Sequence, residues 1–523
     1  MKVVKCIDRL LLASVLCLCI ATSAFGVEIH SNGLGGGRWC DPASWHGGAV
    51  PAGTDVVVVA TGDTIVFDGH SPDGPTCAGL FLDPESVLSL ASNGAEHVLG
   101  VAGPVESYGI IRLDGSRRRE GRLELRLLAP APSCTIRLLR RGGLLAYGAE
   151  GLPDGQFNVV ISTAAVAEGQ TEPVGIIVAG RDSMVDLQRV HLSGVSMQTS
   201  SIDNTGFKAS ERLNVLGCLF TQQARLILHG CDTVAVRNNR FEYQAETPLG
   251  VAAIELNGCK LTDLTGNVVS GYRSGLFLQN DVDSSATGNV VSDGVMGIYW
   301  HGQNAMLRGN RIARCTTGVH ITSSSGVIEK TNVSTSQNAV EVVNSTVQLT
   351  DLHVAELAED GTALSLTNST VTLLNSNVQE TQVKVAGTPP GNEPWVQAIE
   401  YLIVRLKGEW PDGTEVIVGT AQASGGPPPG MADLNVRNSP APLSTSGFTP
   451  LPSSLRPLVV RSWSLRRDGQ VAPAPFYDLL VQAPAAEAGG PPRVLKRVVL
   501  EPKPEWYREE PDAPVPTVEV SVP

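Results

Sequence analysis

The sequence predicts an all-β protein whose central part is a solenoid of stacked coils, and three observations carry that prediction. A small residue followed by apolar, any and apolar residues recurs every 21 to 24 residues between Ala253 and Leu366. A second element, apolar-x-x-Asn-x-apolar, follows at a fixed spacing, and its asparagines are Asn239, Asn267, Asn289 and Asn310. The composition, with 55 Gly, 34 Pro and only 17% charged residues in 523, favours short extended segments over helical bundles.

Strands of period two at this spacing, with no helical pattern between them, make each repeat one coil. A coil cannot bury its inner face alone, so successive coils stack at ~4.8 Å per layer. The recurring asparagines then fall at one place in successive coils, where we expect their amides to hydrogen-bond along a ladder. This pattern resembles the pectate-lyase-like repeat family. That resemblance implies a right-handed parallel β-helix, assigned here to residues 151–386.

Two β-rich segments flank the repeats. Residues 27–150 contain Trp39 and Trp45, then Gly-Gly-Ala-Val-Pro at 47–51 and Gly-Asp-Thr-Ile-Val at 62–66. This order resembles the start of the eight-glycine domain of extracellular proteins, which implies a cap on the open end of the solenoid. Residues 387–523 begin with a Pro/Gly-rich linker and hold strand candidates that resemble a small β-sandwich.

The N-terminus has the three parts of a secretory signal peptide. Basic residues up to Arg9 precede an apolar run from Leu10 to Ala21, and Ala24-Phe25-Gly26 supplies small residues at the cleavage site. The run is shorter than the ~20 residues of a membrane span. Residues 1–26 are therefore predicted to direct export to the periplasm, the cell surface or the outside, with no transmembrane segment in the mature chain.

Charge and cysteine content bound the partners and the covalent links. With 39 basic and 52 acidic residues the net charge is −13, which disfavours nucleic acid as a partner. Cys231 and Cys259 occupy the same position in adjacent coils, so a disulfide between them is one expectation and two buried thiols are the alternative. Cys40 and Cys77 are a second candidate pair, within the cap.

One residue of each repeat strand must point outward, at the middle of the small-apolar-x-apolar pattern. This column reads Glu255, Phe277, Tyr299, His320, Glu341 and Ser365. The resemblance to pectate-lyase-like proteins implies an extended sugar chain on such a surface, with carboxylates accepting hydroxyl hydrogen bonds. The alternative is a solvent-facing column whose aromatic rings stack to stabilise the sheet. The predicted substrate-binding residues are Glu255, Phe277, Gln279, Tyr299, His301 and His320.

The sequence contains no compact catalytic motif. His320 beside Glu341 is the candidate for a base oriented by a carboxylate, with Tyr299 completing a candidate catalytic group. Glu255 and Glu341 lie four coils apart, ~19 Å at ~4.8 Å per coil. That separation is too large for a glycosidase pair. The column also lacks the Arg or Lys base usual in β-helix lyases, by resemblance to that family.

Asp281 and Asp283 form the best calcium candidate, on a turn, with a solvated turn as the alternative. No other cofactor is expected. The sequence thus predicts an exported β-helix protein that binds extracellular polysaccharide, and leaves open whether it is also a hydrolase or lyase. The alternative is a non-catalytic structural or adhesive protein of the cell surface. The oligomeric state is left open.

Overall fold

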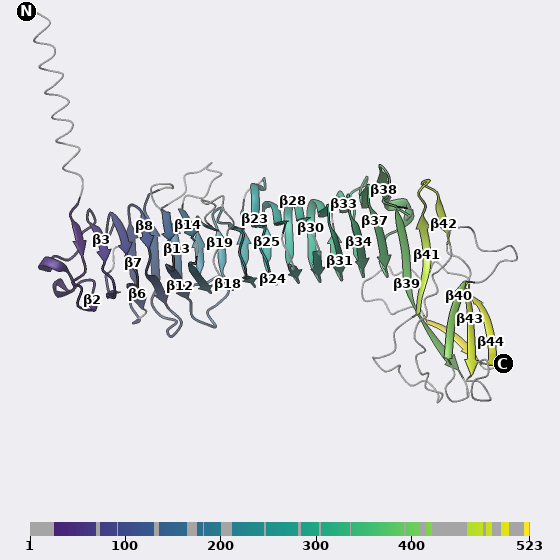
Figure 1. Ribbon diagram of the computed structural model, residues 1–523, viewed down its shortest axis with the longest axis horizontal. Helices are drawn as coiled ribbons and strands as arrows, with labels where there is room; N and C mark the ends of the chain where they lie inside the picture. Colours follow the sequence, from purple (N-terminus) through teal and green to yellow (C-terminus); the bar gives the residue numbers. More distant parts are fainter. Residues whose placement is uncertain are drawn as a thin grey trace, which may run out of the picture. The chain divides into compact units, whose positions relative to one another are not determined.

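The computed structural model describes residues 26–69, 74–91, 93–129, 135–164, 175–180, 182–199, 212–244, 247–280, 284–302, 305–334, 336–391, 394–407, 415–420, 458–473, 477–483, 493–500 and 517–521. Its regular structure there is β, apart from the 3-10 turns η1 (Pro42–Ser44), η2 (His46–Gly48) and η3 (Glu380–Gln382) (Figure 1). Within this part of the chain, no helix has the length and apolarity needed to cross a membrane. The chain divides into two compact units, Met1–Tyr299 and Trp300–Pro523, which are described in turn.

The first unit is built from three stacks of parallel strands. The coils before β7 contribute one strand each to stacks 1 and 2, and from β7 onward each coil contributes one strand to each stack. Stack 1 holds β1 (Glu28–His30), β3 (Val56–Val59), β5 (Gly79–Leu82), β8 (Val105–Ser107), β11 (Thr135–Leu138), β14 (Gly175–Ala179), β17 (Val195–Thr199), β20 (Leu226–His229), β23 (Leu249–Asn257) and β26 (Tyr272–Gln279). Stack 2 holds β2 (Gly36–Arg38), β4 (Thr64–Phe67), β6 (Val87–Ala91), β9 (Ile110–Asp114), β12 (Gly143–Tyr147), β15 (Met184–Gln188), β18 (Arg212–Leu216), β21 (Val234–Arg237), β24 (Thr262–Thr265) and β27 (Ser285–Thr287).

Stack 3 holds β7 (His97–Val101), β10 (Leu123–Leu127), β13 (Val159–Thr163), β16 (His191–Ser193), β19 (Leu219–Thr221), β22 (Arg240–Glu242) and β25 (Val268–Ser270). The long strand β28 (Val290–His301) begins on this stack, beside β25. Parallel pairing starts at β1, so the segment predicted to form a cap contains coils of the same kind. The parallel β-helix prediction is confirmed.

Backbone bends with positive φ separate the three strands of a coil. In the coil from β23 to β26 the bends are Gly258, Gly266 and Gly271, with φ of 64°, 65° and 82°. This left-handed region favours glycine because a Cβ there is strained. Each bend turns the next residue into the interior, and so Cys259 and Asn267 are fully buried.

The predicted asparagine ladder is present. Asn239, Asn267 and Asn289 are each 0% exposed. The Asn239 amide nitrogen donates to Asn267 Oδ1 at 3.0 Å, and the Asn267 amide nitrogen donates to Asn289 Oδ1 at 2.9 Å. Each Oδ1 also accepts the backbone N–H of the preceding ladder asparagine. The ladder therefore supplies hydrogen-bond partners to backbone groups at the tight bends, where strand-to-strand hydrogen bonds are interrupted.

The small residue that opens each repeat has a steric cause. A Cβ at Gly275 on β26 would lie 2.2 Å from Val291 Cγ1, on the part of β28 that belongs to stack 3. The same position in the second unit is Gly318, whose Cβ would lie 2.4 Å from Val333 Cγ1. Only a small residue fits at this position, which explains why Gly or Ala opens each small-apolar-x-apolar repeat in the sequence.

Aromatic packing closes the start of the first unit. Trp39 and Trp45 are each 2% exposed and meet edge to face, with ring centroids 5.1 Å apart. The Trp45 indole N–H donates to the Trp39 carbonyl at 2.7 Å. Buried Asp63 accepts hydrogen bonds from Ser31 Oγ and from the backbone N–H of Gly33, which fixes the loop between β1 and β2. The similarity of this region to the eight-glycine domain stays a prediction.

The second unit is built from the same kinds of stack. Its strands are β29 (Ala305–Arg308), β30 (Arg311–Thr322), β31 (Ser325–Glu329), β32 (Asn332–Ser334), β33 (Asn338–Val343), β34 (Thr346–Thr350), β35 (His353–Ala355), β36 (Thr362–Thr367), β37 (Thr370–Leu374) and β38 (Val383–Ala386). Serine takes over the ladder where asparagine is lost: the Leu352 N–H donates to Ser376 Oγ at 3.1 Å.

Pairing changes direction at β39 (Val396–Lys407). This strand is parallel to β37 on one side and antiparallel to β41 (Leu458–Leu465) on the other. The remaining strands are β42 (Val471–Pro473), β45 (Thr517–Ser521) and the antiparallel set β40 (Glu415–Thr420), β43 (Tyr477–Ala483) and β44 (Arg493–Leu500). The C-terminal β-sandwich and the domain boundaries stay predictions.

Replacing Asn267 by alanine is expected to destabilise the coil stack. The change leaves the Asn239 N–H, the Asn239 amide and the Val236 carbonyl without their partner in a fully buried site. We expect a cost of about 3 kcal/mol, measured as a lower midpoint of chemical denaturation. The matched control is Asn332→Ala, whose side chain points outward and is half-buried. Equal midpoints for the two variants would contradict a structural role for the ladder.

Candidate functional site

The outward column of stack 1 is confirmed in register within the first unit. Pairing aligns Glu106 with Arg137, Ile227 with Glu255, and Glu255 with Phe277 in neighbouring coils. The inward neighbours Leu256 and Leu278 are at most 1% exposed, whereas Glu255 and Phe277 are half-buried. The alternation predicted from the sequence therefore places these side chains on the outer surface of the coils.

Phe277 and Tyr299 stack on each other. Their ring centroids are 4.4 Å apart and their planes differ by 6°, which puts the second half of β28 beside β26. One face of each ring is therefore covered by the other ring. The ring edges and the Tyr299 hydroxyl remain available for other contacts. Burial raises the pKa of Tyr299, so the hydroxyl remains a hydrogen-bond donor at neutral pH.

A row of amides runs beside the aromatic pair. Asn257 and Gln279 occupy matching positions in adjacent coils, and the Asn257 amide nitrogen lies 3.5 Å from Gln279 Oε1. Asn280 follows at the bend and donates to Asn257 Oδ1 at 3.4 Å. Amides offer both donors and acceptors. The first unit therefore brings together Glu255, Phe277, Tyr299 and Gln279 from the predicted binding set, and adds Asn257 to them.

The other predicted residues belong to the second unit. His320 and Glu341 pair in register, and His320 Nδ1 lies 2.9 Å from Glu341 Oε2. Both side chains are partly exposed, at 18% and 33%. Ser365 is the next residue of this column, and His301 is half-buried at the end of β28. The candidate catalytic group is thus divided, with Tyr299 in one unit and His320 and Glu341 in the other.

The structure bears differently on the predicted calcium ligands and on the predicted disulfide cysteines. Asp281 and Asp283 lie outside the described residues. Within the described ranges, no three His, Cys, Asp or Glu side chains are grouped to hold a metal ion. Cys231 and Cys259 are fully buried thiols at matching positions, and Cys259 Sγ lies 3.4 Å from the Leu228 carbonyl oxygen. Cys40 is an exposed thiol and Cys77 a buried one. Both pairings stay predictions.

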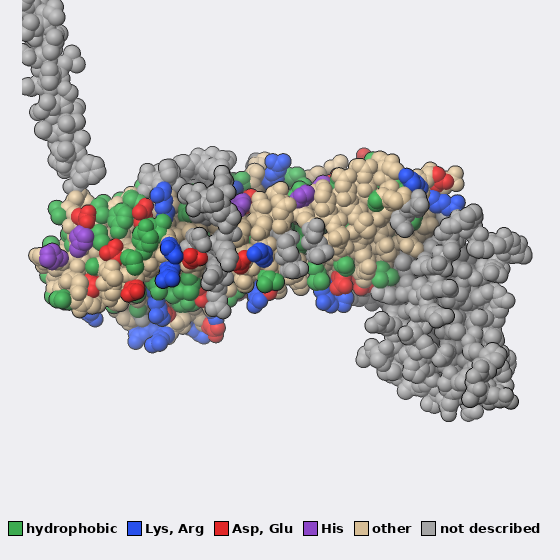
Figure 2. All heavy atoms as spheres, in the orientation of Figure 1, with side chains coloured by type: hydrophobic (Ala, Val, Ile, Leu, Met, Phe, Trp, Pro, Cys, Tyr) green, Lys and Arg blue, Asp and Glu red, His purple; other side chains and the backbone are tan. Residues whose placement is uncertain are grey.

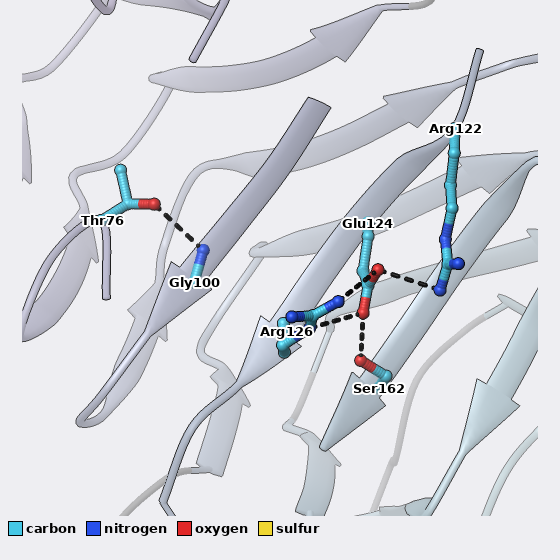
Figure 3. Close-up of polar contacts among 6 residues, drawn as sticks. All are labelled: Thr76, Gly100, Arg122, Glu124, Arg126 and Ser162. Atoms are coloured by element: carbon cyan, nitrogen blue, oxygen red, sulfur yellow. Dashed lines mark hydrogen bonds and ion pairs between the residues drawn. The ribbon is translucent and has the colours of Figure 1, made fainter. Parts of the chain in front are cut away.

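A buried carboxylate on stack 3 was missed by the sequence analysis. Glu124 on β10 is 2% exposed although its side chain alternates with the inward leucines of the strand. Arg126 binds both of its oxygens, at 2.8 and 3.0 Å, and Arg122 lies 2.9 Å from Oε2. Ser162 Oγ on β13 donates to Oε1 at 2.6 Å (Figure 3). The pattern Arg-Leu-Glu-Leu-Arg at 122–126 was the available signal, since alternation puts its three charges on one face.

The surroundings of Glu124 also shift its titration. Burial alone would raise the pKa of the Glu124 carboxyl. The hydrogen bonds from Arg126 and Ser162 and the charges of Arg122 and Arg126 outweigh burial, so the pKa lies below its usual range. On the same stack, burial and then the charge of Arg122 lower the pKa of His191, whose Nε2 lies 2.8 Å from Thr221 Oγ1.

Comparisons with known proteins agree with the fold. Residues 252–390 match the family model described as the right handed beta helix region. No curated protein matches the chain. The described parallel ladders together with that match define a right-handed parallel β-helix.

Several solved structures are similar at low identity. The periplasmic alginate epimerase AlgG is 14% identical, over 58% of this chain and 80% of its own, with a TM-score of 0.43. Tailspike protein 3 of bacteriophage CBA120 is 11% identical, over 61% and 56%, with a TM-score of 0.30. The gp42 tailspike of Acinetobacter phage vb_AbaP_AS12 is 10% identical, over 73% and 77%, with a TM-score of 0.28. These likenesses are too distant to assign an activity.

Stability should depend on pH through Glu124. Its pKa in the folded protein lies below the unfolded value of ~4.3, so its stabilising contribution is full above that value. The contribution is lost as the pH falls through the folded pKa. We therefore expect Glu124→Gln to be less stable than the wild type at pH 7 by on the order of 2 kcal/mol, discounted because both arginines reach water.

This gap should close in acid, because protonated Glu124 has the same charge as glutamine. Denaturation midpoints of both proteins between pH 7 and pH 3 measure it. Glu329→Gln is the control, since its pair with Arg308 is exposed on both sides, at 38% and 55%. A gap that stays constant with pH would show that the carboxylate charge is not what stabilises β10.

Proposed function

We propose that this protein binds polysaccharide along the outward face of stack 1, around Glu255, Phe277 and Tyr299. The observation that carries the proposal is the register of β23 with β26 together with the ring contact between Phe277 on β26 and Tyr299 on β28. It places a carboxylate and two aromatic side chains in three successive coils, with a parallel row of amides beside them. One coil advances by ~4.8 Å, so an extended chain of repeating units meets a similar set of contacts at each step.

The chemistry of these side chains suits sugars. Ring edges and the partly covered aromatic surface offer apolar contact, while Glu255, Asn257, Gln279 and the Tyr299 hydroxyl supply donors and acceptors for hydroxyl groups. Both acidic and basic side chains appear on the face of the first unit drawn in Figure 2, so no single sign of charge dominates it. The described part of this face therefore lacks the continuous basic surface that a nucleic-acid backbone requires (Figure 2). Export, by the predicted signal peptide, would bring the protein to such polymers.

Loss of the aromatic pair should weaken this binding. In a glycan array and in solution titration, Phe277→Ala with Tyr299→Ala is expected to lower affinity at least tenfold, because two side chains of a central contact are removed. Phe81→Ala is the matched control. Phe81 is a half-buried aromatic residue of the same outward column, in register with Glu106, seven coils before Phe277. Equal affinity in the double variant and the control would place the site elsewhere.

Cleavage is tested in the same samples. His320 and Glu341 form the hydrogen-bonded pair that would supply a general base. Reducing ends or unsaturated products formed by the wild type and missing in His320→Ala would support a hydrolase or lyase. Binding without product in the wild type would support a binding module.

A second candidate function is a non-catalytic structural or adhesive protein of the cell surface. The observation that favours a structural role is the ring contact itself, since Phe277 and Tyr299 each cover one face of the other ring. Stacked side chains on neighbouring strands stabilise a sheet without any ligand. In that case the double variant would lower the thermal midpoint, and neither it nor the wild type would bind any glycan.

A further inference from the structure

The outward residues nearest to the Phe277–Tyr299 pair on stack 1 carry a single kind of charge. At the level of Phe277 and Gln279, the described outward residues from β20 to Tyr299 are Ile227, His229, Glu255, Asn257, Phe277, Gln279 and Tyr299. Glu255 is the acidic group of this set, and the set holds no lysine or arginine. Among the described residues, no ion pair involves Glu255. Exposed Arg273 is the basic residue of β26, four residues or ~13 Å of strand before Phe277, whereas Glu255 lies directly opposite Phe277 on the neighbouring strand. A ligand on the aromatic pair therefore lies nearer to the Glu255 carboxylate than to this arginine.

Other arginines of the first unit are held in ion pairs with carboxylates. Arg122 and Arg126 lie on stack 3 at β10 and bind buried Glu124. Arg137 shares the outward column with Glu255, but it is four coils away and pairs with Glu106 at 3.3 Å. The chain as a whole carries a net charge of −13, which adds a weaker repulsion of polyanions over longer distances.

From this charge distribution we infer that the Phe277–Tyr299 site takes an uncharged polysaccharide and discriminates against polyuronates. This inference rests on the proposed glycan binding and specifies its substrate class. Glu255 accepts charge-assisted hydrogen bonds from the hydroxyl groups of a neutral sugar. Against a uronate carboxylate the same group is a like charge at close range, and the neutral amides of Asn257 and Gln279 do not offset it.

The test compares neutral and uronic oligosaccharides of equal length, by titration of residues 27–523. The wild type should bind its best neutral oligosaccharide at least fivefold more tightly than any uronic one, from the size of a single exposed charge contact. Added salt should narrow that ratio. Glu255→Gln should raise uronate affinity by about fivefold, and Glu255→Lys should invert the preference.

Glu106→Gln is the matched control, because Glu106 is a half-buried glutamate of the same outward column. It should leave both affinities unchanged. Uronates that bind as tightly as neutral sugars, or a ratio that Glu255→Gln leaves unaltered, would overturn this inference while leaving glycan binding at stack 1 intact. Absence of binding to every oligosaccharide of both kinds would overturn the proposed function and this inference together.

Discussion

The parallel register between successive coils is the constraint on which the rest of the structure depends. Because each strand pairs residue for residue with the strand one coil away, a residue type that recurs in the sequence becomes a column in space. Inside the coils this register makes the ladder of Asn239, Asn267 and Asn289, which satisfies the polar groups left at the bends. Outside, the same register aligns Glu255 with Phe277 and brings Tyr299 against the ring of Phe277. Structure and candidate site thus have one cause.

The repeats and their outward column could be predicted from the sequence because two independent sequence patterns recur with matching spacing along residues 220–380. The steric limit at Gly275 and the buried position of Asn267 each restrict the residue types that fit, so they leave a strong signal. The coils before β17 are built with the same pairing but lack such a signal. Their bends use varied residues, among them Glu85 and Arg141 at positive φ, and the loops between their strands differ in length.

Two side-chain arrangements could not be predicted from the alternation of inward and outward residues along the strands. The sequence placed Phe277 and Tyr299 in one column, but only the 4.4 Å ring contact shows that they occupy each other's faces. Glu124 reads as an ordinary outward residue of a strand, yet two arginines and Ser162 enclose it. Both cases reflect side-chain packing between coils, which a single sequence does not specify.

The most direct test of glycan binding on stack 1 is a crystal structure of residues 27–523 with a neutral oligosaccharide bound. The register of stack 1 predicts density for an extended sugar chain over β23, β26 and β28, with hydroxyl groups within hydrogen-bonding distance of Glu255 and Gln279 and a ring against the aromatic pair. Density for the sugar on another stack, with the Glu255, Phe277 and Tyr299 side chains left in solvent, would contradict it.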